Sequence, residues 1–391
     1  MNAPTIAGPS HGGEARYLFI DLFRSLIIIL MLEGHVLRQF LPPESRSAFA
    51  FYLHEIFHGI TAPAFLFGAG LTFVISSHRR WTAFHRWGDE LERRVRRIVM
   101  IFLLGIFLHL PFFSFRKTLL EAAPTDILIL FQSDVLTCIS AGLLILHLIL
   151  FFFRREDRFH GAVVTLLIVI VLVTPLVWDV NFLHFTPVLF AQLSNSLHGS
   201  PFPLFPFLAY LFAGVAVSRK FIVAAEAGAV ARFMKRMALG GGLAIAAGLL
   251  STAVPFSFYP TYNFWYTSPS YFLIRLGLLF VIAPAVWLAG EWAGPRIRPL
   301  LILGKESLFV YVLHLLVLYG SVINPGLNLA SLLPARLGLV ESAGVFIALG
   351  LLMFLAATLW QGLKKYHPAA YRYVQAAVGM VVLYLFFTRD Y

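Results

Sequence analysis

Cysteine and charge are the features that this sequence has least of. The 391 residues include a single cysteine, Cys138, which excludes an intramolecular disulfide and a cysteine-rich metal site. Charged residues make up only 13% of the chain against 59% hydrophobic residues, a balance that excludes an ordinary soluble domain. The composition therefore predicts an all-α, polytopic membrane protein.

Acidic residues are scarcer than basic ones, with 19 Asp and Glu against 30 Lys and Arg and a net charge of +11. Such a surplus can indicate a nucleic-acid partner. In this chain, however, the Lys and Arg residues gather between apolar segments, as the positive-inside rule describes for membrane proteins. We therefore expect the lipid bilayer as a partner and no nucleic acid.

The most basic segment, residues 78–97, holds seven arginines and belongs in the cytoplasm by the same rule. Alternating from it gives a multi-pass protein of the plasma (inner) membrane with a cytoplasmic N-terminus. Residues 1–15 are polar and have no recognisable cleavable signal, so we expect a disordered cytoplasmic segment there and one transmembrane domain over residues 16–391. That domain is expected to be a single bundle of about 10–11 membrane-spanning helices, with a homodimer left open. The predicted spans lie near residues 17–40, 56–77, 98–115, 127–153, 160–178, 203–218, 237–254, 270–289, 301–320, 341–361 and 374–388.

Residues 17–40 are long enough to cross a bilayer, yet they contain five ionisable side chains. Such groups are costly at membrane depth and indicate function. Asp21, Arg24 and His35 fall within about 60° of one another around a helix, whereas Glu33 points away. His35 is the predicted general base, because histidine is the residue type most often used for that role, while Asp21 and Arg24 are predicted to bind substrate. The alternative for the latter two is an ion pair that only neutralises both charges.

Residues 54–58, His-Glu-Ile-Phe-His, satisfy the HExxH zinc signature. A catalytic zinc site needs a third protein ligand, which intramembrane metalloproteases usually supply from an Asp-Gly-type motif in a later helix. No Asp-Gly pair occurs in this chain. We therefore expect no metal, and interpret His58 as a catalytic residue and His54 as a substrate-binding residue that line a pocket.

Two further groups of polar residues begin apolar segments. Asp134 is either a helix N-cap or a catalytic acid that orients a histidine. Lys305 lies at the cytoplasmic start of the ninth predicted span, where it either reaches lipid phosphates or binds the phosphates of a nucleotide-like donor. The basic residues predicted to bind that donor are Arg93, Arg94, Arg97 and Lys305.

The first span resembles that of the heparan-α-glucosaminide N-acetyltransferase-like family, in residues 19–24 (Phe-Ile-Asp-Leu-Phe-Arg) and 30–35 (Leu-Met-Leu-Glu-Gly-His). The similarity continues at residues 61–70, Thr-Ala-Pro-Ala-Phe-Leu-Phe-Gly-Ala-Gly, at residues 133–136 and from Gly304 to His314. Ser25 departs from the pattern by replacing the glycine that commonly follows the arginine. Gly59 stands where the family often has a polar residue.

The resemblance implies about ten or eleven helices and an enzyme, a transmembrane acyltransferase. Acetyl-CoA or another acyl-CoA would be the donor substrate on the cytoplasmic side, and a carbohydrate or glycan on the far side would be the acceptor. His35 would deprotonate the acceptor or transiently carry the acyl group, since a thioester is already activated and needs mainly positioning and a base.

Two other functions remain open from the sequence. A transporter or channel would use the polar face of the first span as its pathway, and would show flux without chemistry. An intramembrane zinc protease would use residues 54–58 and bind zinc tightly.

Overall fold

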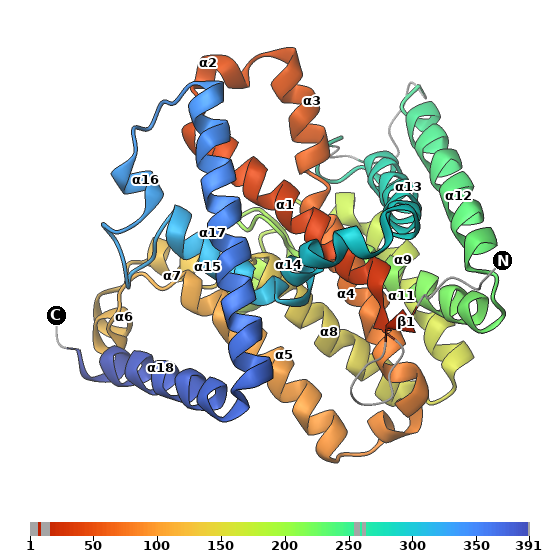
Figure 1. Cartoon of the computed structure of the whole chain (residues 1–391), viewed down its shortest axis with the longest axis horizontal. Coiled ribbons are helices and arrows are strands. Elements are labelled where there is room, and N and C mark those ends of the chain that lie inside the picture. The colour runs from red at the N-terminus through yellow and green to blue at the C-terminus, as the bar shows by residue number, and fades with distance from the viewer. Residues whose placement is uncertain (1–6, 9–15, 254–258, 260–262, 390–391) are drawn as a thin grey trace. The chain divides into compact units, whose positions relative to one another are not determined.

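The computed structural model describes residues 7–8, 16–253, 259 and 263–389, and nearly all of the elements in it are helices (Figure 1). The exception is a pair of two-residue antiparallel strands, β1 (Ala7–Gly8) and β2 (Arg16–Tyr17). The rest of the segment predicted to be disordered, residues 1–6 and 9–15, lies outside the described residues. The predicted all-α class is confirmed.

Eight helical segments of the described chain are long and apolar enough to cross a membrane. The first helix and the arginine-rich fifth are not among them, and the helix that carries His314 is shorter, at 12 residues. A chain with this many segments long and apolar enough to cross a bilayer is a multi-pass membrane protein.

The chain divides into two compact units, which we describe separately. Unit 1 contains residues 1–61, 110–126 and 286–391. Its helices are α1 (Leu18–Phe40), α2 (Pro43–Arg46), α3 (Phe49–His58), α6 (Phe115–Glu121), η3 (Gly294–Leu300), α14 (Leu301–Lys305), α15 (Ser307–Leu318), α16 (Leu329–Leu332), α17 (Leu339–Tyr366) and α18 (Pro368–Thr388).

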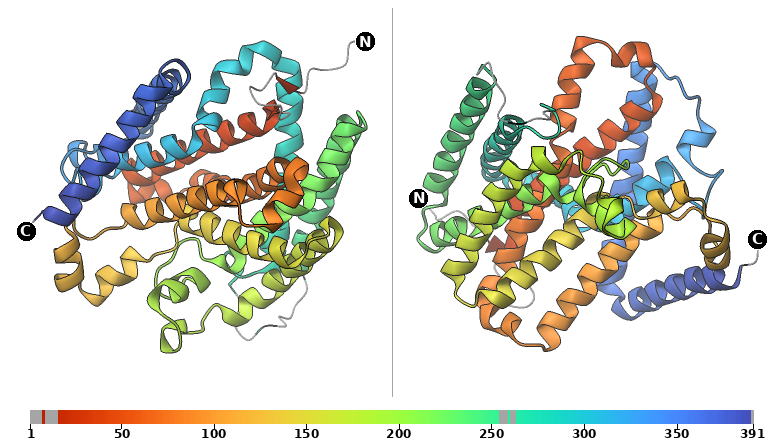
Figure 2. Two further views of the ribbon diagram at one scale, coloured as in Figure 1. Left: turned by 90° about the horizontal axis from the view of Figure 1, so that it is seen from below. Right: turned by 180° about the vertical axis from the view of Figure 1, so that it is seen from behind.

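Helix α1 is the centre of unit 1. Its run of Leu, Ile and Phe residues contains no proline, and it ends at Leu41, where the chain turns extended ahead of the pair Pro42-Pro43. It packs against α14, α15 and α17, and the views agree in placing the red ribbon of α1 beside the cyan ribbon of α14 (Figures 1 and 2). The contact with α14 is close, because a Cβ atom on Gly304 would collide with the backbone oxygen of Asp21.

Unit 2 contains residues 62–109 and 127–285. Three of its helices, α4, α7 and α13, begin or end in unit 1. Its helices are α4 (Thr61–Ser77), η1 (His78–His85), α5 (Asp89–Leu108), α7 (Pro124–Leu130), α8 (Val135–Phe152), α9 (Glu156–Val177), η2 (Phe182–His184), α10 (Val188–Ser194), α11 (Leu204–Glu226), α12 (Val230–Ser251) and α13 (Pro269–Ala293).

Small residues let the helices of unit 2 approach closely, as membrane helices commonly do. A Cβ atom on Gly70 of α4 would collide with the backbone oxygen of Leu211 in α11, and one on Gly214 would collide with that of Phe67. Ser218 joins the same two helices by donating to the backbone oxygen of Leu71 at 3.1 Å.

Each of the eleven predicted spans corresponds to a helix or a pair of helices, and three of them are interrupted. Residues 127–153 divide at Phe131–Asp134 into α7 and α8, and residues 301–320 divide at Glu306 into α14 and α15. The second span divides at Gly59 into α3 and α4. Apolar content alone does not reveal these breaks, each of which lies beside an ionisable residue predicted for the site.

Candidate active site

Three aromatic side chains of unit 1, those of His58, His314 and Tyr319, meet around His35 of α1. The ring centroid of His35 lies 5.2 Å from that of His314, 5.9 Å from that of His58 and 5.8 Å from that of Tyr319. His35 is partly exposed, whereas His58 and His314 are buried. The cluster thus contains one partly exposed imidazole, that of His35, and two buried imidazoles.

The closest pair is His35 and His314, whose Nδ1 and Nε2 atoms are 3.0 Å apart and within hydrogen-bond distance. The other ring nitrogen of His314, Nδ1, bonds the backbone oxygen of Val310 one turn earlier at 3.1 Å. Tyr319, at the end of α15, donates from its hydroxyl to the backbone oxygen of His35 at 3.3 Å. Helix α15 therefore contacts both the ring and the backbone of His35.

His58 reaches the cluster because the neighbouring position on α1 is glycine. A Cβ atom on Gly34 would collide with the imidazole ring of His58. His54, one turn earlier on α3, stacks nearly parallel to His58 with centroids 6.0 Å apart. The predicted catalytic pair of His35 and His58 and the predicted substrate-binding His54 thus lie in one row of side chains.

Carboxylates border this row. The helical pattern predicts that Glu33 points away from His35. In the structure Glu33 accepts a hydrogen bond from Nε2 of His54 at 2.8 Å. Glu55 forms an ion pair with Arg38. Among the described residues, no group of three or more His, Cys, Asp or Glu side chains is arranged to hold a metal ion. Within the HExxH segment, His54 and Glu55 thus make polar contacts between α3 and α1.

Asp21 and Arg24 lie near the opposite end of α1. His35 lies eleven residues after Arg24 on this helix, a rise of about 16 Å. Asp21 is buried, and Ser25 links this end to the α14 region by donating to the backbone oxygen of Leu300 at 2.7 Å. The structure therefore does not bring the predicted substrate-binding residues Asp21 and Arg24 to the histidine cluster.

Lys305 ends α14, in the same unit and near that end of α1. The next residue, Glu306, is buried and accepts from Lys364 of α17 at 3.4 Å. Lys305 itself is partly exposed. This region thus offers ammonium groups at the break between α14 and α15, some distance along the chain from His314.

Asp134, in unit 2, is the N-cap of α8. Its Oδ1 atom accepts from the backbone nitrogen of Thr137 at 2.7 Å and from the hydroxyl of the same residue at 2.9 Å. The side chain is buried, and a Cβ atom on Gly105 would lie 3.0 Å from Oδ1. The carboxylate is thus engaged in capping, the first of its two predicted roles.

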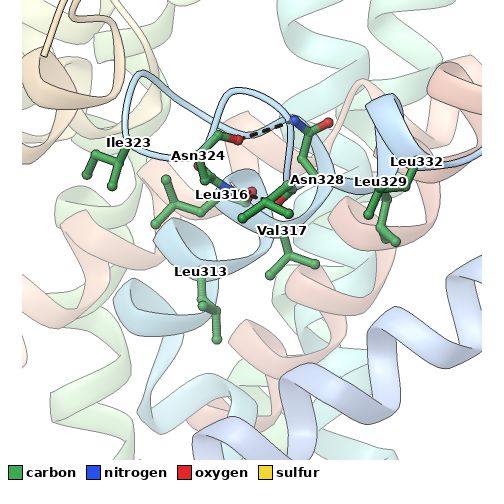
Figure 3. Close-up of a pocket in the computed structure, with 9 residues that line it drawn as sticks. Leu313, Leu316, Val317, Ile323, Asn324, Asn328, Leu329 and Leu332 are labelled. Atoms are coloured by element: carbon green, nitrogen blue, oxygen red, sulfur yellow. Dashed lines mark hydrogen bonds between the residues drawn. The ribbon is translucent and has the colours of Figure 1, made fainter.

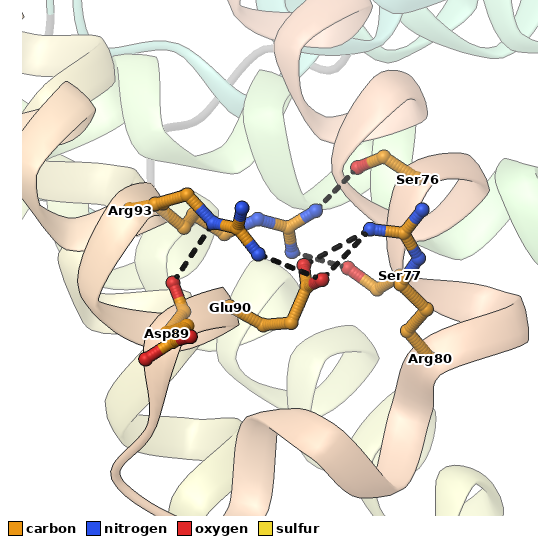
Figure 4. Close-up of polar contacts among 7 residues, drawn as sticks. Ser76, Ser77, Arg80, Asp89, Glu90 and Arg93 are labelled. Carbon is orange, nitrogen blue, oxygen red and sulfur yellow. Dashed lines mark hydrogen bonds and ion pairs between the residues drawn. The ribbon is translucent and has the colours of Figure 1, made fainter. Parts of the chain in front are cut away.

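The basic residues of α5, also in unit 2, fall into two kinds, and Figure 4 shows Arg93 beside Asp89 and Glu90. Arg94 donates to Ser77 at 2.5 Å and to Ser76 at 2.6 Å, with its guanidinium 4.2 Å from the ring centroid of Phe84. Arg93 is 68% exposed and pairs with Glu90, and Arg97 is exposed. Arg93 and Arg97 are therefore more accessible to a ligand than Arg94, which holds α4 and α5 together.

An apolar pocket of about 350 Å³ lies on α15 and α16 (Figure 3). None of the predicted site residues lines it. Asn324, at its rim, donates to the backbone oxygen of Leu316 at 2.9 Å. The lining residues are Leu313, Leu316, Val317, Ile323, Asn324, Leu327, Asn328, Leu329 and Leu332.

His314 and Tyr319 are the residues of the cluster that the sequence did not single out for a role. His314 ends the motif that begins at Gly304, so its position was visible. Its contact with His35 spans 279 residues of sequence and cannot be read from the periodicity of one helix.

Comparison with known proteins shows to which family the chain is similar. The catalytic-domain family of heparan-alpha-glucosaminide N-acetyltransferase matches residues 16–247, more than half of the chain. No curated protein matches the chain. The match includes the helices that carry His35, His54 and His58, and it confirms the resemblance that the sequence motifs indicated. The chain therefore belongs to the heparan-alpha-glucosaminide N-acetyltransferase family, a family of membrane acetyltransferases.

Proposed function

We propose that this protein transfers an acetyl group, or another acyl group, from acyl-CoA on the cytoplasmic side of the plasma membrane to a carbohydrate acceptor on the outer side. The observation that carries the proposal is the position of His35. It is a partly exposed imidazole on α1, in contact with the buried His314. A base held beside an activated thioester is the main chemical requirement of such an enzyme.

In this reaction His35 takes the proton of an acceptor hydroxyl or amine as the oxygen or nitrogen attacks the thioester carbonyl. The new C–O or C–N bond forms, the C–S bond breaks, and the proton passes to the coenzyme A thiolate. An amine acceptor arrives as an ammonium ion and must lose one further proton to solvent. Because His58 and His54 continue from His35, they supply polar contacts for the acceptor in this proposal.

We propose Arg93 and Arg97 of unit 2 and, separately, Lys305 of unit 1 as candidate contacts for the phosphates of coenzyme A, because the positive-inside rule assigns all three to the cytoplasmic side. Arginine suits this role because its guanidinium fork matches phosphate oxygens. In this proposal Arg94 has an indirect role. It holds α5 against α4, because its guanidinium donates to the hydroxyls of Ser76 and Ser77. Asp134 enters the proposal only through its cap of α8.

Sealed proteoliposomes test the transfer itself. Labelled acetyl-CoA is supplied on one side and glucosamine, as the probe acceptor, on the other, with His184→Ala as the control because His184 is exposed. The native protein and His184→Ala should acetylate glucosamine across the membrane, whereas His35→Ala should not. Acetylation that requires both substrates on the same side would contradict transmembrane transfer.

The donor site is tested separately with Arg97→Gln and Arg94→Gln. Removing an exposed phosphate contact should weaken acetyl-CoA binding, by about 10- to 150-fold if the bond is charge-assisted, and reduce its dependence on salt. Arg94→Gln should lower thermal stability first, since it breaks contacts between α4 and α5. Unchanged acetyl-CoA affinity in Arg97→Gln would remove this residue from the donor site.

A further inference from the structure

We propose that His314 is a positioning residue that sets the tautomer of His35, so that Nε2 of His35 is the atom that takes the acceptor proton. This inference rests on the proposed function, because it names the reacting atom of the base and the group that prepares it. It concerns a residue outside the part of the chain that the family match covers, residues 16–247.

The argument starts from the short distance between the two rings. His35 Nδ1 and His314 Nε2 are 3.0 Å apart, and a hydrogen bond between two ring nitrogens needs a proton on one and a lone pair on the other. Two imidazolium rings would point N–H groups at each other, so at least one ring is neutral. The remaining question is which nitrogen donates.

The backbone oxygen of Val310 answers that question. A carbonyl oxygen can only accept, so Nδ1 of His314, at 3.1 Å, carries a proton. In a neutral ring the other nitrogen, Nε2, then has the lone pair. It accepts from Nδ1 of His35, which leaves Nε2 of His35 without a proton as long as the His35 ring is neutral.

The alternative is a doubly protonated His314 that donates to His35. His314 is fully buried, and the contacts described for its ring are His35, Tyr311 and the Val310 carbonyl, none of them negatively charged. An unpaired charge in such a place is costly. The neutral ring with its lone pair toward His35 is therefore the favoured state.

This arrangement is suited to catalysis. The hydrogen bond from Nδ1 fixes both the tautomer and the orientation of the His35 ring, in the way that the partner of a catalytic histidine generally does. When Nε2 takes the acceptor proton, the imidazolium that forms keeps its hydrogen bond to His314. The Tyr319 hydroxyl, bonded to the backbone oxygen of His35, ties the same helix to the base.

Three variants of His314 separate this role from packing. A glutamine can place an acceptor near Nε2, an asparagine reaches only the position of Nδ1, and a phenylalanine fills the space without an acceptor. We expect His314→Phe and His314→Asn to lower kcat about 10- to 100-fold with little change in KM for acetyl-CoA, and His314→Gln to retain most of the activity. Equal activity of the native protein and His314→Phe would overturn the proposal.

The tautomer itself is measured by ¹⁵N magnetic resonance of protein labelled at histidine, with His35→Gln to assign the His35 signals. The native protein should show His35 protonated at Nδ1 alone, and His314→Phe should shift it toward the Nε2-protonated form. An Nε2-protonated His35 in the native protein would contradict the inference. Because this measurement needs no acetyl-CoA, it remains informative if the protein proves not to transfer acyl groups, so the two failures are distinguishable.

Discussion

At the scale of single residues, Gly34 determines where His58 lies. The Gly34→Ala substitution would force the imidazole of His58 away from α1, because the new methyl group would occupy its place. We expect a loss of about 1–3 kcal/mol in stability from overpacking, together with reduced activity. Thermal unfolding in detergent and acetyl transfer measure the two effects.

The matched control is Gly242→Ala, since a Cβ atom on Gly242 of α12 has open space around it. That substitution should gain up to about 1 kcal/mol from helix propensity and leave activity unchanged. If Gly34→Ala behaved like Gly242→Ala, the contact between His58 and Gly34 would be wrong.

Also at the scale of single residues, two variants of Asp134 distinguish a capping role from a catalytic role. Asp134→Ala removes the side-chain acceptor for the Thr137 backbone nitrogen and should cost about 0.5–2 kcal/mol. Asp134→Asn keeps an acceptor oxygen, so we expect it to retain both thermal stability and acetyl transfer. A stable Asp134→Asn variant without activity would place the carboxylate in the reaction after all.

At the scale of the elements, the crossing of α4 and α11 depends on two glycines that face carbonyl oxygens. A methyl group on Gly70 meets the backbone of Leu211, which cannot move aside as a side chain can. We therefore expect Gly70→Ala to destabilise the protein more than Gly34→Ala, with a lower yield of folded protein in a size-exclusion profile. An unchanged profile would show that this crossing is looser than described.

The position of the long helices could be predicted from apolar runs and basic connections, whereas the interruption at Glu306 could not. The break between α14 and α15 leaves Glu306 buried beside Lys364, 58 residues away in sequence. Partners from other helices satisfy such a residue, and hydropathy does not report them. The N-cap at Asp134 was foreseen because capping depends on local sequence.

At the scale of the whole molecule, some residues of the candidate site could be predicted from a local sequence pattern, whereas their contacts depend on parts of the chain that are far apart in sequence. His35 stood out because an ionisable residue in an apolar span is conspicuous. Its two histidine neighbours lie on other elements. His58 is on α3, which follows a reversal of the chain after α1, and His314 is on α15, 279 residues further along the sequence. The single transmembrane domain predicted over residues 16–391 stays a prediction beside the two units described here.

The central claim is that His35 performs acyl-CoA chemistry, and release of coenzyme A by the purified protein tests it most directly. Acetyl-CoA binding by calorimetry and release of the free thiol are measured for the native chain, His35→Ala and the control His184→Ala. We expect all three proteins to bind acetyl-CoA, and only the native protein and His184→Ala to release coenzyme A. Failure of the native protein to bind acetyl-CoA or longer acyl-CoAs, or thiol release undiminished in His35→Ala, would contradict the account.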